Sequence, residues 1–289
     1  MNYYLHIAVL LEIYILLALS ANQMIGNSGL LNLSHAVFYG LGAYVTAILT
    51  TQYGFGYFQT WVLLFPSIII ISILYSYIGS KVRELYFSLA SLTVQVIFSS
   101  LLLNLTQLTK GPYGIPGISH PEIAGYSINN PLSFAILGLS IIALCILGLF
   151  LLSKRKFYLL IQATRDDEIG LLNLGYNPNK YRFLSISVSG LLASIAGSIY
   201  ASYMTFIDPS SFTLDESILI LSIVLIGGIG SFRGAIIGAA IYVLLPEILN
   251  DLHLPQDYAA NLRMVLFGLL LIFIVRFRPQ GILGKKYVT

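Results

Sequence analysis

Long apolar runs are the feature of this 289-residue sequence that most constrains its fold. A helix needs about 20 apolar residues to cross a bilayer, and runs of this length recur along the whole chain. Charged residues make up only 9% of the sequence, against roughly 25% in soluble domains. We therefore predict an all-α, polytopic integral membrane protein, one domain over residues 1–289, with about nine transmembrane helices, some of them broken at glycine-rich stretches. The predicted spans lie near 5–25, 30–50, 60–79, 85–107, 132–152, 183–207, 216–229, 234–250 and 259–276.

A polar stretch from residue 153 to 182 interrupts the apolar runs. It contains the signals of a short helix: Thr164 stands at an N-cap position, and Asp167 follows three residues later as its capping-box partner. Gly175 is placed to end the helix, and Pro178 blocks its continuation. A helix of about ten residues is marginal alone in water, so this one needs a surface to lie against.

The same stretch has an amphipathic pattern. Arg165, Ile169 and Leu172 follow one another at spacings of four and three residues, which predicts one helix face carrying a charge and an apolar patch. Asp166, Asp167 and Glu168 put negative charge on the first turn, where the helix dipole favours it.

The positions of Lys and Arg predict the orientation. If 153–182 is cytoplasmic and the spans alternate, every basic residue except Lys110 and Arg263 falls in a cytoplasmic loop or tail. We therefore expect the N-terminus outside and the C-terminus in the cytoplasm. The N-terminal apolar run lacks a preceding basic region, so we expect a retained span rather than a cleaved signal.

Two of the predicted spans contain polar groups that invite a functional interpretation. Glu12 lies in the first span, where an ionisable residue is either functional or packed among helices in a paired or protonated form; the packed interpretation is favoured. In residues 26–44, Ser34 and His35 interrupt an apolar run. That stretch is either a broken or re-entrant helix beside a solute path, or a helix whose small residues Ala36 and Gly40 allow close packing.

Four polar residues on the fourth span recur at spacings of three, four and four, which places them on one helix face. Such a face avoids lipid, so it serves either interhelix hydrogen bonds or a solute pathway. Together with Ser34 and His35 these residues are the candidate solute path: Ser88, Ser91, Gln95 and Ser99.

Small residues mark close helix contacts in the second half of the chain. Ser189, Ala193, Gly197 and Ala201 are each four residues apart, a pattern typical of helix–helix contacts in membranes. Residues 227–240 predict two half-helices that meet at a break near the inner surface, as in many transporter solute sites. This break resembles the one at 26–42 and hints at an internal repeat. Its break and packing residues are Gly227, Gly228, Gly230, Gly234 and Gly238.

The outer loop 109–123 is rich in Gly and Pro, so we expect no regular structure there. A connecting loop is the simplest interpretation, and a gating or docking role is the alternative.

Chemical motifs argue against an enzyme. The sequence contains no GxxxxGKS or GxxxxGKT phosphate loop, no HExxH, no CxxC and no GxSxG. Its single cysteine, Cys145, lies in an apolar run and predicts a buried small residue. No basic patch with interleaved aromatic residues points to nucleic acid. We therefore predict no catalytic residues, no metal and no cofactor bound by this chain.

Four segments carry a family resemblance that runs from about residue 22 to 284. These segments resemble permease subunits of ABC importers for branched-chain amino acids. They are ANQMIGNSGLLNLSHAVFYGLGAY, TKGPYGIPGI, ATRDDEIGLLNLGYNPNKYR, and the closing segments SFTLDESILILSIVLIGGIGSFRGAIIGAA and RFRPQGILG. Gln23 and Asn27 depart from the family's usual residues, and Gly170 and Leu171 replace two usual alanines.

The resemblance implies a multi-pass subunit of a bacterial-type plasma (inner) membrane. Its implied partners are a second related permease, two cytoplasmic ATPase subunits that bind the ATP, and an extracytoplasmic substrate-binding protein. Closure of the ATPase pair would rock the permease between outward-open and inward-open states. The implied contacts with the ATPase come from 153–182 and comprise Arg165, Asp167, Glu168, Ile169, Leu172 and Gly175.

Two alternatives remain open at the level of sequence. The first alternative is an ABC permease of the same type for another small solute, because related permeases transport urea or amides. The second alternative, which has less support, is a proton-coupled secondary transporter that works alone. Glu12 would then be its proton carrier.

Overall fold

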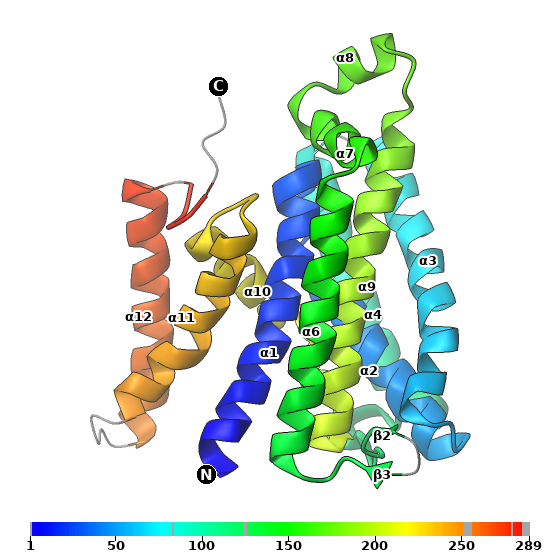
Figure 1. Ribbon diagram of the computed structural model, residues 1–289, viewed down its shortest axis with the longest axis vertical. Helices are drawn as coiled ribbons and strands as arrows, with labels where there is room; N and C mark the ends of the chain where they lie inside the picture. The colour runs from blue at the N-terminus through cyan, green and yellow to red at the C-terminus, as the bar shows by residue number, and fades with distance from the viewer. Residues whose placement is uncertain (1, 83, 124–125, 251–255, 279, 285–289) are drawn as a thin grey trace.

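The computed structural model describes residues 2–82, 84–123, 126–250, 256–278 and 280–284, and these residues form an upright bundle of long helices (Figure 1). The helices are α1 (Asn2–Asn22), the π-helix η1 (Gln23–Asn27), α2 (His35–Gln52), α3 (Tyr57–Lys81), α4 (Glu84–Asn104), α5 (Thr106–Thr109), the 3₁₀ helix η2 (Gly111–Tyr113), α6 (Pro131–Ser153), α7 (Lys156–Asp166), α8 (Glu168–Asn173), α9 (Pro178–Met204), the 3₁₀ helix η3 (Pro209–Phe212), α10 (Leu214–Gly227), α11 (Phe232–Asn250) and α12 (Gln256–Phe277). The strands are β1 (Ile115–Pro116), β2 (Glu122–Ile123), β3 (Tyr126–Ser127) and β4 (Phe206–Ile207).

The all-α membrane architecture is confirmed, and each predicted span coincides with a helix. Among the described residues, five helices are long and apolar enough to cross a membrane: α1 with η1, α3, α4, α6 and α9. The pair α10 and α11 is bent by 120° and forms one broken span or a re-entrant loop. The predicted count of nine is therefore not confirmed. The ninth predicted span, 259–276, falls in α12, whose side chains are described only in part.

Helix α9 is the centre of the bundle and packs against α1, α2 and α3. Its small-residue row makes the predicted close contact. Gly197 faces α2, where an added Cβ would lie 2.9 Å from the Ala43 nitrogen and closer still to the Tyr39 carbonyl. Ala193 and Ala201 have no exposed surface. Residues this small let the two backbones approach, and the resulting contact holds α2 in place.

The first glycine-rich stretch is a break in the helix. After η1 the chain is non-helical from Gly29 to Ser34, and helix resumes at His35. Gly29 has a φ of +72°, which glycine adopts without steric cost. The packing interpretation also applies, because an added Cβ on Gly40 would lie 3.1 Å from the Phe212 ring. Residues 26–44 are thus both broken and closely packed.

The second glycine-rich stretch is the sharp turn between α10 and α11. Gly228 and Gly230 have φ values of +126° and +75°, so the turn uses backbone conformations that other residues rarely adopt. Gly227 packs against Gly234, and Gly238 packs against the Ile223 carbonyl. The predicted half-helices and their break are confirmed.

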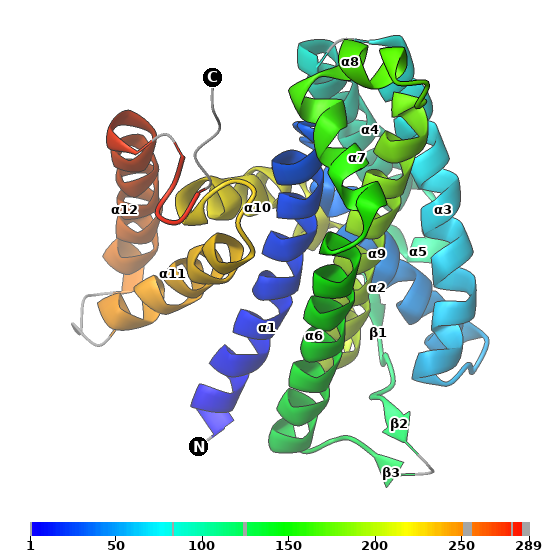
Figure 2. The ribbon, with the colours of Figure 1, turned by 45° about the horizontal axis from the view of Figure 1, so that its top comes forward.

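The outer loop is more regular than predicted. Its strand β1 pairs antiparallel with β4 at the end of α9, with Ile115 opposite Ile207, and β2 pairs with β3. Figure 2 shows β2 and β3 beneath the helical bundle, with β1 leading down to them. The expectation of no regular structure was wrong because two residues between glycine turns suffice for a short strand pair. The pairing ties the loop to α9.

The two ends of the bundle differ. The α7–α8 segment lies at one end, and α1 begins at the opposite end, which is also the end where β2 and β3 lie (Figure 1). The backbone of Ile282 donates to the Ile226 carbonyl (3.0 Å), so the described C-terminal residues lie beside the α10–α11 turn. Of the basic residues used for orientation, Arg83, Lys285 and Lys286 lie outside the described residues, as does the side chain of Arg263. Which end faces the cytoplasm stays a prediction.

Candidate functional site

The predicted amphipathic helix is two helices, α7 and α8, with Asp167 between them. The Asp167 carboxylate accepts a hydrogen bond from the Gly170 nitrogen (2.8 Å), so Asp167 is the N-cap of α8. The predicted N-cap, Thr164, is wrong. It lies inside α7, and its hydroxyl donates to the Ile161 carbonyl (2.6 Å). The N-cap is Asp167 and not Thr164 because α7 extends through the polar residues that were expected to start a helix.

Helix α8 ends as predicted at Gly175, which has a φ of +82°. The Gly175 nitrogen donates to the Leu172 carbonyl (2.9 Å), and the Tyr176 nitrogen donates to the Leu171 carbonyl (3.1 Å). This pair of bonds is a Schellman motif, which satisfies the last carbonyls of the helix. Pro178 does not only stop α8: it occupies the first turn of α9, after the Asn177 cap.

One face of α8 is apolar and exposed. Ile169 and Leu172 are 72% and 54% exposed, although Leu171 on the same helix is buried. Leu171 packs with Ile161 and Tyr181 and so anchors α8 to α7 and α9. An exposed apolar face on so short a helix is typical of a contact surface for another protein. Arg165 does not share this face, contrary to the predicted pattern, because the break at Asp167 separates it from α8.

Helix α7 is docked on η1 by one polar face. The Tyr158 hydroxyl donates to Gln23 Oε1 and Gln162 Nε2 donates to Asn27 Oδ1, both at 3.2 Å. Arg165 Nη1 donates to the Gly26 carbonyl (2.6 Å). Tyr158, Gln162 and Arg165 recur at spacings of four and three, so a single face of α7 makes all three bonds.

Arg165 also packs on the first break itself. An added Cβ on Gly29 would lie 2.8 Å from Arg165 Cγ, so the stem of the arginine occupies the space that the glycine leaves. The two glycine-rich breaks then meet directly: an added Cβ on Gly26 would lie 2.6 Å from the Gly230 nitrogen. The Gly230 nitrogen donates to Asn22 Oδ1 (2.7 Å). A continuous set of contacts thus runs from α7 through Arg165 and Gly26 to the α10–α11 turn.

The serine residues of the predicted solute path satisfy the non-helical backbone. Ser91 Oγ accepts from the Leu33 nitrogen (2.9 Å), and Ser88 Oγ donates to the Leu31 carbonyl (3.0 Å). Ser34 Oγ donates to Asn32 Oδ1 (2.7 Å) and bonds the Tyr75 hydroxyl. These bonds fix the segment between η1 and α2 against α3 and α4.

The remaining path residues connect the starts of α2 and α10. Gln95 Nε2 donates to the Phe212 carbonyl (2.8 Å), and its Oε1 accepts from Ser217 Oγ (3.1 Å), which in turn accepts from the Ala36 nitrogen (2.9 Å). His35 Nε2 and Ser20 Oγ are hydrogen bonded at 2.8 Å. Ser99 is a weak partner of Gln95 (3.4 Å). All predicted path residues except Ser99 are buried, so their role in solute passage stays a prediction.

Two carboxylates that the sequence interpretation passed over lie at the start of α10. Because the adjacent Ser217 bonds Gln95, in the middle of α4, Asp215 and Glu216 lie near mid-depth of the bundle. Asp215 is exposed and lines a groove of about 860 Å³ between α10, α11 and α12. The Glu216 carboxylate lies beside the Tyr14 hydroxyl. The signal that could have revealed them was an acidic pair opening an apolar run.

The carboxylate in the first span is packed between helices. Glu12 is 4% exposed and lies against Gly138 of α6. Its Oε2 atom has no hydrogen-bond partner among the described residues. This placement agrees with the packed interpretation of Glu12; a role in proton transfer stays untested.

Broken helices inside an apolar bundle, joined to an exposed amphipathic segment at one end, define a membrane transport subunit of the permease class. The family model described as branched-chain amino acid transport system / permease component matches residues 3–275. The chain belongs to this family.

Similar proteins support the assignment. The high-affinity branched-chain amino acid transport system permease protein LivM of Escherichia coli (strain K12) is 31% identical over 300 residues, which covers 96% of this chain and 69% of that protein. A probable branched-chain amino acid transport permease protein LivM of Methanocaldococcus jannaschii is 27% identical over 72% of this chain and 62% of its own length. The autoinducer 2 import system permease protein LsrC of Yersinia enterocolitica is 32% identical over 56% of this chain and 48% of its own. No solved structure matches this chain significantly.

Proposed function

We propose that this chain is the membrane-spanning permease subunit of an ATP-driven importer for branched-chain amino acids. The observation that carries the proposal is the exposed apolar face of α8, whose Ile169 and Leu172 lie at the end of the bundle remote from the outer strands. A short helix of this kind needs a partner. ATPase subunits in the cytoplasm are the partner that the family of the chain favours.

The docking of α7 suggests how ATPase movement would reach the membrane. A shift of α8 carries α7 with it, because Leu171 and Ile161 pack together. Arg165 would then move Gly26, and Gly26 would move the α10–α11 turn at Gly230. In this proposal the two breaks are the elements that switch between outward-open and inward-open states. A second related permease would complete the path, and a binding protein outside would deliver the solute.

The mid-depth carboxylates favour an amino acid over urea or an amide as the solute. Asp215 and Glu216 suit the ammonium group of an amino acid, whereas urea and amides are neutral. The apolar walls of the groove beside Asp215, which include Leu219 and Phe267, suit a branched aliphatic side chain.

Uptake by cells tests the proposal. Deletion of the gene for this chain from its own strain should lower uptake of labelled leucine, and the intact gene should restore it. A doubly substituted chain, Ile169→Asp with Leu172→Asp, should insert in the membrane yet fail to restore uptake. Asn179→Asp adds a charge at an exposed position in the first turn of α9, outside α8, and should restore uptake normally.

Three results would contradict parts of the proposal. Full uptake with the double substitution would show that the apolar face of α8 is not the ATPase contact. Competition of leucine uptake by urea or acetamide as strong as that by unlabelled leucine would favour the alternative solutes. Transport by the purified chain in vesicles, driven by a proton gradient without an ATPase, would favour a secondary transporter.

A further inference from the structure

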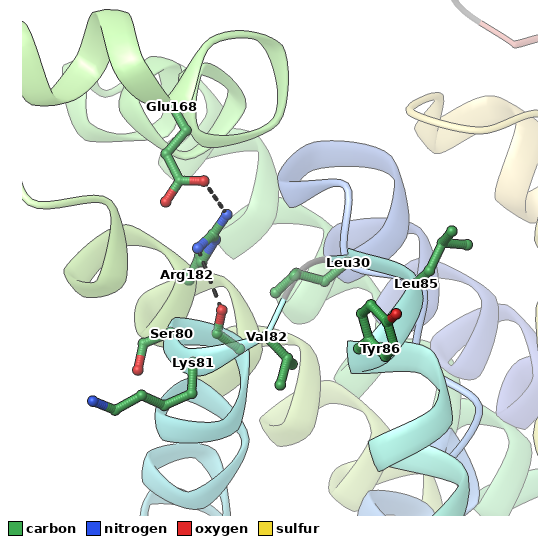
Figure 3. Close-up of a pocket in the computed structure, with 9 residues that line it drawn as sticks. Leu30, Ser80, Lys81, Val82, Leu85, Tyr86, Glu168 and Arg182 are labelled. Carbon is green, nitrogen blue, oxygen red and sulfur yellow. Dashed lines mark hydrogen bonds and ion pairs between the residues drawn. The ribbon is translucent and has the colours of Figure 1, made fainter.

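A cavity beside α8 borders the first break and is separate from the mid-depth groove. It has a volume of about 670 Å³, within the range of small-molecule sites. It lies where the end of α3, the start of α4 and the start of α9 meet α8 and Leu30 of the non-helical segment after η1 (Figure 3). Its lining includes Leu30, Val82, Leu85, Tyr86, Glu168 and Arg182.

The charged end of the cavity is an arginine whose donors are only partly used. Arg182 is 8% exposed, and its Nη2 donates to Glu168 Oε2 (2.8 Å). Its Nη1 makes a long bond to the Gly79 carbonyl (3.4 Å), and its Nε has no partner among the described residues. A guanidinium carries five N–H donors, and a buried one is normally fully bonded. Each Nη atom carries a second N–H beyond the bond just named, so the guanidinium can still donate to a further acceptor.

A negative group stands next to this positive one. The Glu168 side chain is 42% exposed and contacts Arg182 through Oε2. Across the cavity lie the apolar residues Leu30, Val82 and Leu85 (Figure 3). A cation and an anion side by side, facing an apolar wall, are complementary to a zwitterion with an aliphatic side chain.

We propose that this cavity binds a free amino acid with an apolar side chain, as an inhibitory product site. The α-carboxylate would accept from Arg182, the α-ammonium would donate to Glu168, and the side chain would lie on Val82 and Leu85. The proposal rests on the proposed function for the class of amino acid and for the side from which it enters. A bound amino acid would bridge α8 to α9 and hold the segment that has to move, so accumulated product would slow import.

An anionic lipid headgroup is the competing occupant. The geometry disfavours it, because the Lys81 ammonium points away from Val82 and Leu30 (Figure 3), and the Glu168 carboxylate would repel a phosphate. The experiment below distinguishes the two.

Equilibrium binding tests the site directly. Labelled leucine is added to the purified transport complex in detergent without the binding protein. Val82→Trp would fill the cavity and should weaken binding by about 10-fold or more. Leu89→Trp places the same side chain further along α4 at a position that is 60% exposed and away from the cavity, and it should bind as the unsubstituted chain does. 4-Methylpentanoate, which lacks the ammonium, and 3-methylbutylamine, which lacks the carboxylate, should compete poorly.

A transport assay tests the inhibition. In sealed vesicles with leucine on the α8 side, initial uptake should be slower than without it, and Val82→Trp, not Leu89→Trp, should abolish the difference. Equal leucine binding by both variants overturns the proposal, as does equal competition by 4-methylpentanoate or by phosphatidylglycerol. If no uptake occurs without internal leucine, the proposed function fails, while the binding assay still decides whether the site exists.

Discussion

A single glycine contact joins the two breaks of this permease. Gly26 lies so close to Gly230 that no side chain fits between them, and the Asn22 carboxamide bonds the Gly230 nitrogen beside it. Neighbouring bonds fix η1 as well: Asn27 Nδ2 donates to Gln23 Oε1 (2.9 Å). Gln23 and Asn27, which depart from the usual family pattern, are the residues that bond Tyr158 and Gln162 of α7.

Gly26→Ala should separate the breaks. Its Cβ would lie 2.6 Å from both Asn22 Oδ1 and the Gly230 nitrogen. We expect a loss of about 1–3 kcal/mol in stability, the usual effect of overpacking, and a large loss of uptake. Thermal unfolding of the purified protein and uptake of labelled leucine measure the two effects. Gly148→Ala, in α6, is the matched control because nothing lies within 4 Å of its added Cβ. Similar unfolding of both variants would show that the Gly26 contact is unimportant.

Arg165 is the residue through which α7 reaches the first break. Arg165→Ala removes the bond to the Gly26 carbonyl and the packing on Gly29. We expect solute-stimulated ATP hydrolysis by the complex to fall about 10-fold or more, with the chain still assembled, and Arg165→Lys to recover part of it. Hydrolysis by the reconstituted complex is the measurement. Lys156→Ala, at the exposed start of α7, is the control. Unchanged ATP hydrolysis with Arg165→Ala would show that Arg165 does not take part in coupling to the ATPase.

At the scale of elements, α8 depends on its two end motifs. Asp167→Ala removes the N-cap bond to the Gly170 nitrogen and should cost about 1 kcal/mol. For a helix of six residues that loss favours fraying, so we expect faster amide exchange in Glu168–Asn173 and weaker association with the ATPase. Hydrogen exchange and co-purification measure these effects. Asp166→Ala removes an adjacent exposed carboxylate that is not the N-cap and should change neither. Equal exchange in the two variants would contradict the capping assignment.

At the scale of the molecule, the polar ends of the bundle should face opposite compartments. In a Cys145→Ser background, Tyr113→Cys in the outer loop should react with a membrane-impermeant maleimide in intact cells, because Tyr113 is 89% exposed. Lys156→Cys at the exposed start of α7 should react only after permeabilisation. The reverse pattern would invert the predicted orientation and with it the ATPase contact.

Much of the architecture could be predicted from sequence because it rests on local patterns. Apolar runs placed the helices, the small-residue row of α9 marked its contact with α2, and the glycines of 227–240 marked the turn. Gly175 was predicted to end α8 for a local reason, since that position needs a left-handed backbone. Local patterns predict less well where two residues suit the same structural role. Thr164 and Asp167 both suit an N-cap, and only the path of α7 selects between them.

The sequence by itself determined that this chain is a helical membrane protein, because hydrophobic length and residue size act within a few turns of the chain. Its permease class follows from the family that its residues 3–275 match. Only the tertiary structure decided which distant groups meet: Arg165 with Gly26, Gly26 with Gly230, and Glu168 with Arg182. It also decided that the polar stripe of α4 satisfies the backbone around Leu31 and Leu33. Those pairings depend on how buried hydrogen bonds are completed among segments far apart in the chain, and no local pattern encodes that choice.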